Sequence, residues 1–109
     1  MNWNKLEQIT QLDKIIEASL QQPQVIFKHS TRCSISSMVQ NRLERSGAIP
    51  NITFYYLDLI AHRDISNEIA ERFGVEHQSP QLLLIKDGKC IFNESHMAID
   101  MQDIAINAA

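Results

Sequence analysis

The chain has few of the residues that build some common kinds of functional site. Its 109 residues include only two cysteines, Cys33 and Cys90, which cannot form the dense disulfide framework of a small secreted domain. The three glycines are scattered at positions 47, 74 and 88, so a glycine-rich phosphate-binding loop is excluded. His62, His77 and His96 show neither H-x-x-x-H spacing nor a close cysteine, so we expect no metal site.

Charge and hydropathy exclude further functions. Thirteen acidic and ten basic side chains give a formal net charge of −3, without a basic block. We therefore expect no nucleic-acid partner and no attachment to an anionic membrane. The first residues lack the apolar core of a signal peptide, and no apolar run approaches the ~18 residues of a membrane-spanning helix. We expect one soluble, cytoplasmic domain over residues 1–109, able to bury roughly two thirds of its unfolded surface.

What is present is a regular alternation of strand and helix patterns. Asp87-Gly88 is a strong signal for a two-residue hairpin turn between the last two strands. Strands are expected at Leu6–Ile9, Gln24–Lys28, Ile52–Leu59, Leu82–Ile85 and Cys90–Phe92. Helices are expected from Thr10, where Asp13 completes a capping-box variant, from Cys33 to Ser46, from a capping Asp64 to Gly74, and from Asp100.

The resulting order is β-α-β-α-β-α-β-β-α. Right-handed crossovers make the early strands parallel, and the final hairpin completes a central mixed sheet with helices on both faces. This α/β arrangement is thioredoxin-like. The junction at Cys33, between the second strand and the second helix, falls where that fold carries its reactive cysteine.

Cys33 lies where the apolar run Val25–Phe27 gives way to an amphipathic helix. At the start of a helix, free backbone N–H groups and the helix dipole favour a negative charge. A thiol in such a position is readily converted to the nucleophilic thiolate near neutral pH. An isolated cysteine can instead be a small buried residue, but most neighbours of Cys33 are polar. We therefore expect Cys33 to be catalytic.

The four residues Cys33-Ser34-Ile35-Ser36 form a C-x-x-S motif. In a C-x-x-C pair the second thiol releases the partner from the mixed disulfide, which a serine hydroxyl cannot do. Ser36 can still hydrogen-bond to the Cys33 thiolate from one helical turn away. The remaining chemistry is monothiol exchange, in which an outside thiol frees Cys33.

Three basic residues precede the motif. Arg32 adjoins the thiol, and we expect it to stabilise the thiolate or to contact an anionic thiol partner. For Lys28 and His29 the same role and a solvated position are equally reasonable.

Cys90 follows the hairpin turn beside apolar residues, which favours a packed core residue over a resolving thiol for Cys33.

Ser79-Pro80 precedes the expected strand Leu82–Ile85. In thioredoxin-like folds a cis proline at this place packs beside the thiol and leaves the preceding backbone free to pair with a bound peptide. X–Pro bonds are cis in only roughly 5–6% of cases in folded proteins. The fold pattern nevertheless leads us to expect a cis bond here.

Phe27-Lys28-His29-Ser30-Thr31-Arg32-Cys33-Ser34-Ile35-Ser36 closely resembles the F-K-H-S-x-x-C-P-I-S segment of monothiol bacilliredoxins of the YtxJ type. The similarity extends in order over nearly the whole chain, through the segments 69–75, 77–81, 86–89 and 93–96. The resemblance implies a thioredoxin-like fold and removal of bacillithiol from protein mixed disulfides. It makes Cys33 the attacking thiol and Ser79-Pro80 the cis-proline pair, with bacillithiol or a similar small thiol as co-substrate and no tightly bound cofactor.

One position departs from the family pattern. Ser34 stands where the family usually has proline after the cysteine. Proline at the first helical position removes a donor, whereas Ser34 restores an N–H group that can face the thiolate. We expect this change to alter the reactivity of Cys33 without removing the nucleophile.

Two other functions compete with thiol exchange. A non-catalytic thioredoxin-like module would bind proteins along Ser79-Pro80 without turnover. An iron–sulfur carrier of the monothiol glutaredoxin kind would resemble C-G-F-S at the cysteine, and Ser34-Ile35 lacks that glycine.

Overall fold

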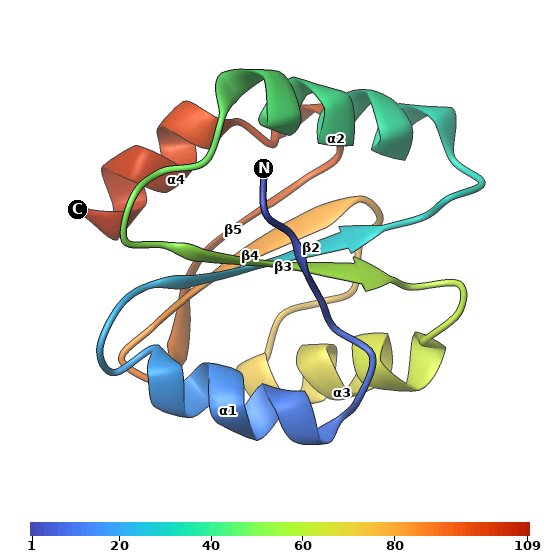
Figure 1. Cartoon of the computed structure of the whole chain (residues 1–109). Coiled ribbons are helices and arrows are strands. Elements are labelled where there is room, and N and C mark those ends of the chain that lie inside the picture. The colour runs from blue at the N-terminus through green and yellow to red at the C-terminus, as the bar shows by residue number, and fades with distance from the viewer.

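A computed structural model of residues 1–109 contains one five-stranded sheet covered by helices on both faces (Figure 1). The strands are β1 (Asn4–Lys5), β2 (Gln24–His29), β3 (Thr53–Asp58), β4 (Gln81–Lys86) and β5 (Lys89–Ser95). The helices are α1 (Thr10–Ala18), α2 (Ser34–Ser46), α3 (Arg63–Phe73) and α4 (Met101–Ala108), with a 3₁₀ turn, η1, at His96–Ala98. The order of elements is the one expected from the sequence.

The sheet has the strand order β1-β3-β2-β4-β5. β1, β3 and β2 are parallel, whereas β4 is antiparallel to both β2 and β5. The helices α2 and α4 cover one face, and α1 and α3 cover the other (Figure 1). This is the thioredoxin-like mixed sheet that the sequence predicts.

The core consists of two apolar clusters separated by the sheet. Alternate residues of β2 enter different clusters, because successive side chains of a strand point to opposite faces. Val25 and Phe27 pack with residues of α2 and α4, whereas Ile26 packs with residues of α1 and α3. Every residue of β2 is buried, so this central strand fixes both layers.

Two expectations for the first twenty residues were wrong. The first strand is Asn4–Lys5 rather than Leu6–Ile9, because Asn4 and Lys5 pair with β3 while Leu6 already enters the core. Thr10 and Asp13 form no capping box. The side-chain oxygen of Gln11 instead accepts hydrogen bonds from the N–H groups of residues 7 and 8, at 2.7 and 2.8 Å.

The third helix begins two residues earlier than expected. Its N-cap is His62, which makes no side-chain capping bond, and Asp64 lies inside the first turn. There its carboxylate is near the positive end of the helix dipole. Gly74 ends this helix in the left-handed conformation, as expected, with φ of 64°. Asp100 caps α4 through a 2.7 Å bond from the N–H of Gln102.

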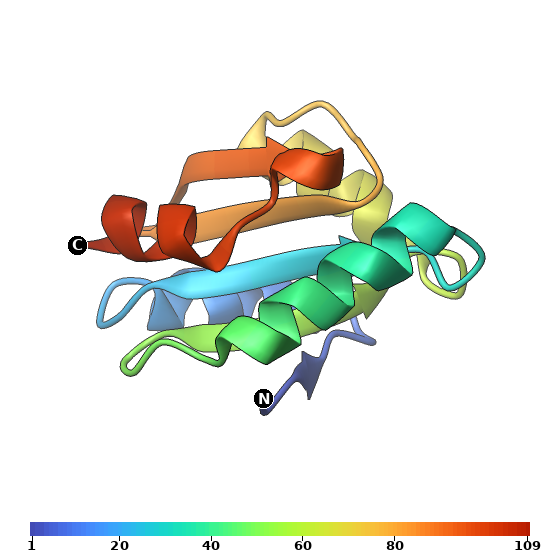
Figure 2. The same ribbon diagram turned by 90° about the horizontal axis from the view of Figure 1, so that it is seen from above.

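The loops that concern function lie at one end of the sheet (Figure 2). They are the β2–α2 loop, the β3–α3 loop and the segment that leads into β4.

No helix has both the length and the apolar character needed to cross a membrane.

Candidate active site

Cys33 is the N-cap residue of α2 and its thiol is partly exposed. Its backbone is extended, with φ of −108° and ψ of 119°. Its N–H donates to the Ser30 carbonyl at 3.1 Å, and its own carbonyl accepts from the Ser37 N–H at 3.1 Å. The earlier N–H groups of the helix therefore have no intrahelical acceptor, and the dipole directs positive potential towards this end. This end of α2 can therefore stabilise a negative charge placed next to Cys33.

Ser36, the last residue of the motif, lies inside the protein rather than beside the thiol. Its side chain is fully buried. The hydroxyl lies 2.6 Å from His29 Nδ1 and accepts a hydrogen bond from the Ser30 N–H at 3.1 Å. The hydrogen bond expected between Ser36 and Cys33 is not formed. Ser36 instead ties the first turn of α2 to the end of β2.

His29 is buried between two aromatic rings. Its ring centroid lies 5.9 Å from that of Phe27 and 5.5 Å from that of Tyr56. Burial lowers the pKa of His29, although the neighbouring Asp58 carboxylate opposes this effect. A neutral imidazole contributes no charge to a thiolate, and the buried ring is not solvated. Both expectations for His29, a charged partner of the thiolate and a solvated side chain, were therefore wrong. Its role in the structure is to hold Ser36.

Lys28 points to the opposite face of the sheet from His29 and is also fully buried. Its ammonium lies 3.1 Å from His77 Nδ1. Burial lowers the pKa of Lys28 to about 8. Because α2 covers the other face (Figure 1), Lys28 is not a ligand of the Cys33 thiolate, and it is not solvated either.

The segment before β4 is held by a second buried side chain, that of Gln81. Its amide nitrogen donates to the Glu76 carbonyl at 3.0 Å, and its amide oxygen accepts from the Gln78 N–H at 3.4 Å. The Ser79–Pro80 bond is cis, as expected. The N–H and carbonyl of Ser79 make no hydrogen bond within the chain, and are therefore available to a bound peptide.

Strand register brings this segment to the cysteine loop. Lys28 pairs with Gln81 in the antiparallel β2–β4 ladder. Pro80 therefore lies beside the last residue of β2, where the chain turns towards Cys33. The Pro80 carbonyl is bonded by the His96 N–H at 2.9 Å, so the end of β5 supports it from the other side.

The remaining residues proposed from the sequence lie on the surface. Arg32 and Ser34 are exposed and make no side-chain hydrogen bond. Both adjoin Cys33 in the chain, so their roles towards the thiolate or its partner remain predictions.

Cys90 lies at the far end of the sheet. It pairs with Ile85, which in turn pairs with Gln24, the first residue of β2. Cys33 follows the last residue of β2, so the two thiols are separated by roughly the length of a six-residue strand, about 20 Å. Cys90 is half-buried against the α1–α3 cluster, and burial raises its pKa. It cannot resolve a disulfide on Cys33 of the same chain.

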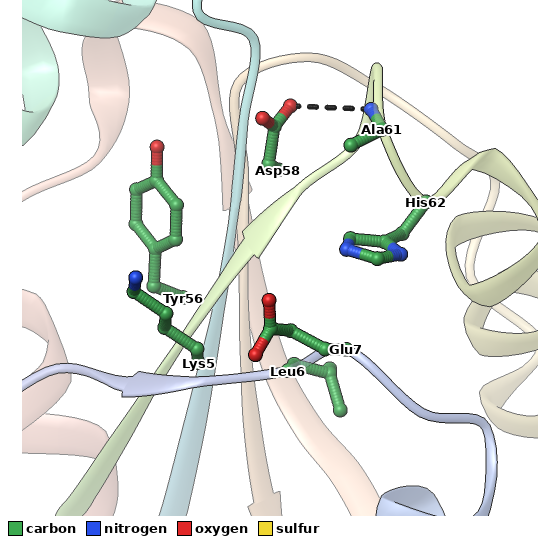
Figure 3. Close-up of a pocket in the computed structure, with 7 residues that line it drawn as sticks. All are labelled: Lys5, Leu6, Glu7, Tyr56, Asp58, Ala61 and His62. Carbon is green, nitrogen blue, oxygen red and sulfur yellow. Dashed lines mark hydrogen bonds between the residues drawn. The ribbon is translucent and has the colours of Figure 1, made fainter.

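A small pocket lies beside the end of β3 (Figure 3). Its volume is about 200 Å³. It is formed where β1 and β3 end, and Asp58 at its rim pairs with His29 of β2. Its lining residues are Lys5, Leu6, Glu7, Tyr56, Asp58, Ala61 and His62.

Sequence reasoning missed the buried polar side chains that hold the two loops. Lys28 and His29 stood out only as positive charges near a thiol, and Gln81 only as part of a family segment. The available signal was the two consecutive polar residues at the end of an otherwise apolar central strand, because buried polar groups need specific partners.

The fold and the lone cysteine at the start of α2 define a thioredoxin-like oxidoreductase of the monothiol type. The family model of the monothiol bacilliredoxin BrxC matches residues 4–104. The chain belongs to this family of monothiol bacilliredoxins.

Solved structures share the thioredoxin fold of this chain. A candidate oxidoreductase with a thioredoxin fold is 29% identical, with a TM-score of 0.80 over 96% of this chain and 92% of that one. Mitochondrial thioredoxin 3 from Saccharomyces cerevisiae is 26% identical, with a TM-score of 0.69 over 86% and 83% of the two chains. Thioredoxin from Malassezia sympodialis shares the fold at 19% identity, with a TM-score of 0.76 over 99% and 92%.

Proposed function

We propose that the protein removes a low-molecular-weight thiol, bacillithiol, from protein mixed disulfides through Cys33. The observation that carries this proposal is a single, partly exposed thiol at the N-cap of α2, with a buried serine hydroxyl in place of a second thiol. Family membership supports bacillithiol as the small thiol.

The reaction proceeds by two thiol–disulfide exchanges. The Cys33 thiolate attacks the bacillithiol sulfur of the mixed disulfide, forming a new S–S bond and breaking the old one. The substrate cysteine leaves as a thiolate and takes up a proton. A second bacillithiol thiolate then attacks the adduct on Cys33, releasing bacillithiol disulfide and regenerating the Cys33 thiolate. Over the cycle the substrate cysteine is reduced and two bacillithiol molecules end as one disulfide. The reaction therefore needs no other oxidant or reductant.

The substrate protein is proposed to pair with the backbone of Ser79. Its free N–H and carbonyl offer one donor and one acceptor to an extended peptide. Such pairing would add a short strand beside the entry to β4 and bring the substrate disulfide to the cysteine loop. Arg32 and Ser34, exposed next to Cys33, are proposed to contact the bound thiol.

Adduct transfer to Cys33 tests the proposal directly. The protein is incubated with a substrate protein carrying bacillithiol in mixed disulfide, and both chains are followed by intact-mass spectrometry. We expect bacillithiol to appear on Cys33 and to be released when free bacillithiol is added. The Cys90→Ser variant should behave like the wild type, and Cys33→Ser should accept nothing. A folded wild-type protein that never acquires the adduct would contradict the proposal.

The same thiol distinguishes catalysis from simple protein binding. An enzyme needs a Cys33 that reacts with iodoacetamide at pH 7 much faster than an ordinary cysteine, whereas a binding module needs no such reactivity. Measuring the alkylation rate of Cys33 against that of free cysteine at pH 7 decides between the two.

A further inference from the structure

Three buried polar side chains, from three different elements, surround the segment Glu76–Pro80. Lys28 of β2 is fully buried, and Ser66 of α3 and Gln81 of β4 are almost so. Gln81 bonds to the backbone at residues 76 and 78, as described above. Lys28 and Ser66 both reach the side chain of His77, at 3.1 and 3.2 Å from Nδ1. Burying polar groups costs free energy, so the convergence of three of them on one short segment indicates that they hold this segment in a defined position.

The contact with Lys28 determines the state of His77. An ammonium group has only donors, so Nδ1 must be the acceptor and the ring must carry its proton on Nε2. Burial and the nearby charges of Lys28 and Arg63 lower the pKa of His77, which keeps the imidazole neutral. The charged groups facing this ring are therefore Lys28 from β2 and Arg63 from α3, both cationic.

We propose that Lys28 is a positioning residue for substrate docking: through His77 it fixes the Glu76–Pro80 segment so that the Ser79 backbone presents its N–H and carbonyl to the substrate protein. This inference rests on the function proposed above. It assigns a role to a buried lysine that lies on the opposite face of the sheet from α2 and outside the thiol chemistry.

The mechanism predicts a selective defect. Loss of the Lys28–His77 contact loosens the segment that binds protein, while the start of α2 is still held by Ser36 and His29. Attack on a small disulfide does not use the Ser79 backbone, whereas attack on a protein mixed disulfide does. The informative quantity is therefore the ratio of the rate constants for a bacillithiolated protein and for bacillithiol disulfide. This ratio cancels the thiolate fraction of Cys33.

The first experiment compares Lys28→Met with the wild type and with Lys86→Met as a matched control. Like Lys28, Lys86 donates a hydrogen bond from its ammonium, but its acceptor is the backbone carbonyl of Ala108, at 3.2 Å, and it lies at the other end of β4. We expect Lys28→Met to lower the ratio about tenfold, as loss of a charge-assisted hydrogen bond would. The melting temperature should not fall, because methionine removes a buried charge. Lys86→Met should leave the ratio unchanged.

Variants of His77 provide a second, independent measurement. His77→Gln keeps an acceptor for Lys28 and should retain most of the wild-type ratio, whereas His77→Leu removes the acceptor and should lower it like Lys28→Met. In the wild type the ratio should also fall in acid, where a protonated His77 faces Lys28, and His77→Gln should abolish that dependence.

Two outcomes would overturn the inference while the proposed function stood. One is an unchanged ratio in both Lys28→Met and His77→Leu. The other is an equal loss of rate on both substrates, which would indicate a general structural role. If wild-type Cys33 accepted no bacillithiol from either substrate, the proposed function itself would fail.

Discussion

Lys28 and His29 are consecutive residues of β2 whose side chains leave opposite faces of the sheet and hold different loops. His29 bonds to Ser36 at the start of the helix that carries the thiol. Lys28 bonds to His77 in the segment that carries the cis proline. The last two residues of one central strand thus fix both halves of the candidate active site relative to each other.

Removal of the Ser36 hydroxyl should destabilise the fold. In Ser36→Ala the partly buried Ser30 N–H and the buried His29 Nδ1 both lose their partner, and an unsatisfied buried polar group costs about 1–3 kcal/mol. We expect the free energy of unfolding, measured in urea, to fall by this amount. Ser37→Ala is the control, because Ser37 makes no side-chain hydrogen bond, and it should change stability by less than ~0.5 kcal/mol. Equal effects of the two substitutions would refute the structural role of Ser36.

Lys28 should make stability depend on pH above neutrality. Its pKa is lowered from 10.5 to about 8 by burial, so between these values the unfolded chain binds more protons than the folded one. The cost of burying the ammonium is therefore complete below pH 8 and disappears towards pH 10.5. Lys28→Met should be more stable than the wild type at pH 7, by roughly 1–3 kcal/mol, and should lose this advantage towards pH 10.5.

The measurement for Lys28 is a difference between two proteins at each pH. Burial raises the pKa of Cys90 and of both tyrosines, which also titrate in this range. Comparing wild type with Lys28→Met by urea unfolding at several pH values cancels their contribution. An advantage that stays constant from pH 7 to 10.5 would be inconsistent with a titrating Lys28.

Ser34→Pro should lower the reactivity of Cys33 without disturbing the helix. Proline is compatible with the first helical position, but it removes the N–H of residue 34 next to Cys33. We expect iodoacetamide to alkylate Cys33 more slowly at pH 7, by up to about tenfold, with an unchanged melting temperature or a higher one. An equal or faster alkylation would show that the Ser34 N–H does not serve the thiolate.

Oxidation of the isolated protein should link different molecules. Cys33 and Cys90 lie at opposite ends of the sheet, too far apart to form a disulfide in one chain. Treatment with diamide should give disulfide-linked dimers on a non-reducing gel. Cys90→Ser should still form them, because the Cys33 thiol is partly exposed, and Cys33→Ser should form few. A fast-migrating monomer with an internal disulfide would contradict the topology.

Much of the fold was predictable because each element carries a local signal. The hairpin at Asp87-Gly88 and the cap at Asp100 depend on a few neighbouring residues, and both were found in the structure. The first strand was misplaced because two exposed residues, Asn4 and Lys5, have no apolar alternation. Their pairing depends on β3, about fifty positions later in the chain.

The site was predictable only where the chemistry lies in adjacent residues. Cys33 at a strand–helix junction and the cis bond at Ser79–Pro80 follow from short segments and the order of elements. The contact between Lys28 and His77 joins residues from two distant segments. A sequence records neither the face to which a side chain points nor its distance from water, so a solvated position was considered for Lys28, which is fully buried.

The position of Ser36 also bears on how this protein could be turned into a dithiol enzyme. A cysteine at position 36 would enter a dry site already shared by an imidazole and a backbone amide, and a thiol is a poor substitute for a hydroxyl in both bonds. Acquiring a resolving thiol would therefore require changes at His29 and in the Ser30 turn as well. The proposed dependence on an outside thiol is consequently a property of several residues together, and we expect Ser36→Cys alone not to reverse it.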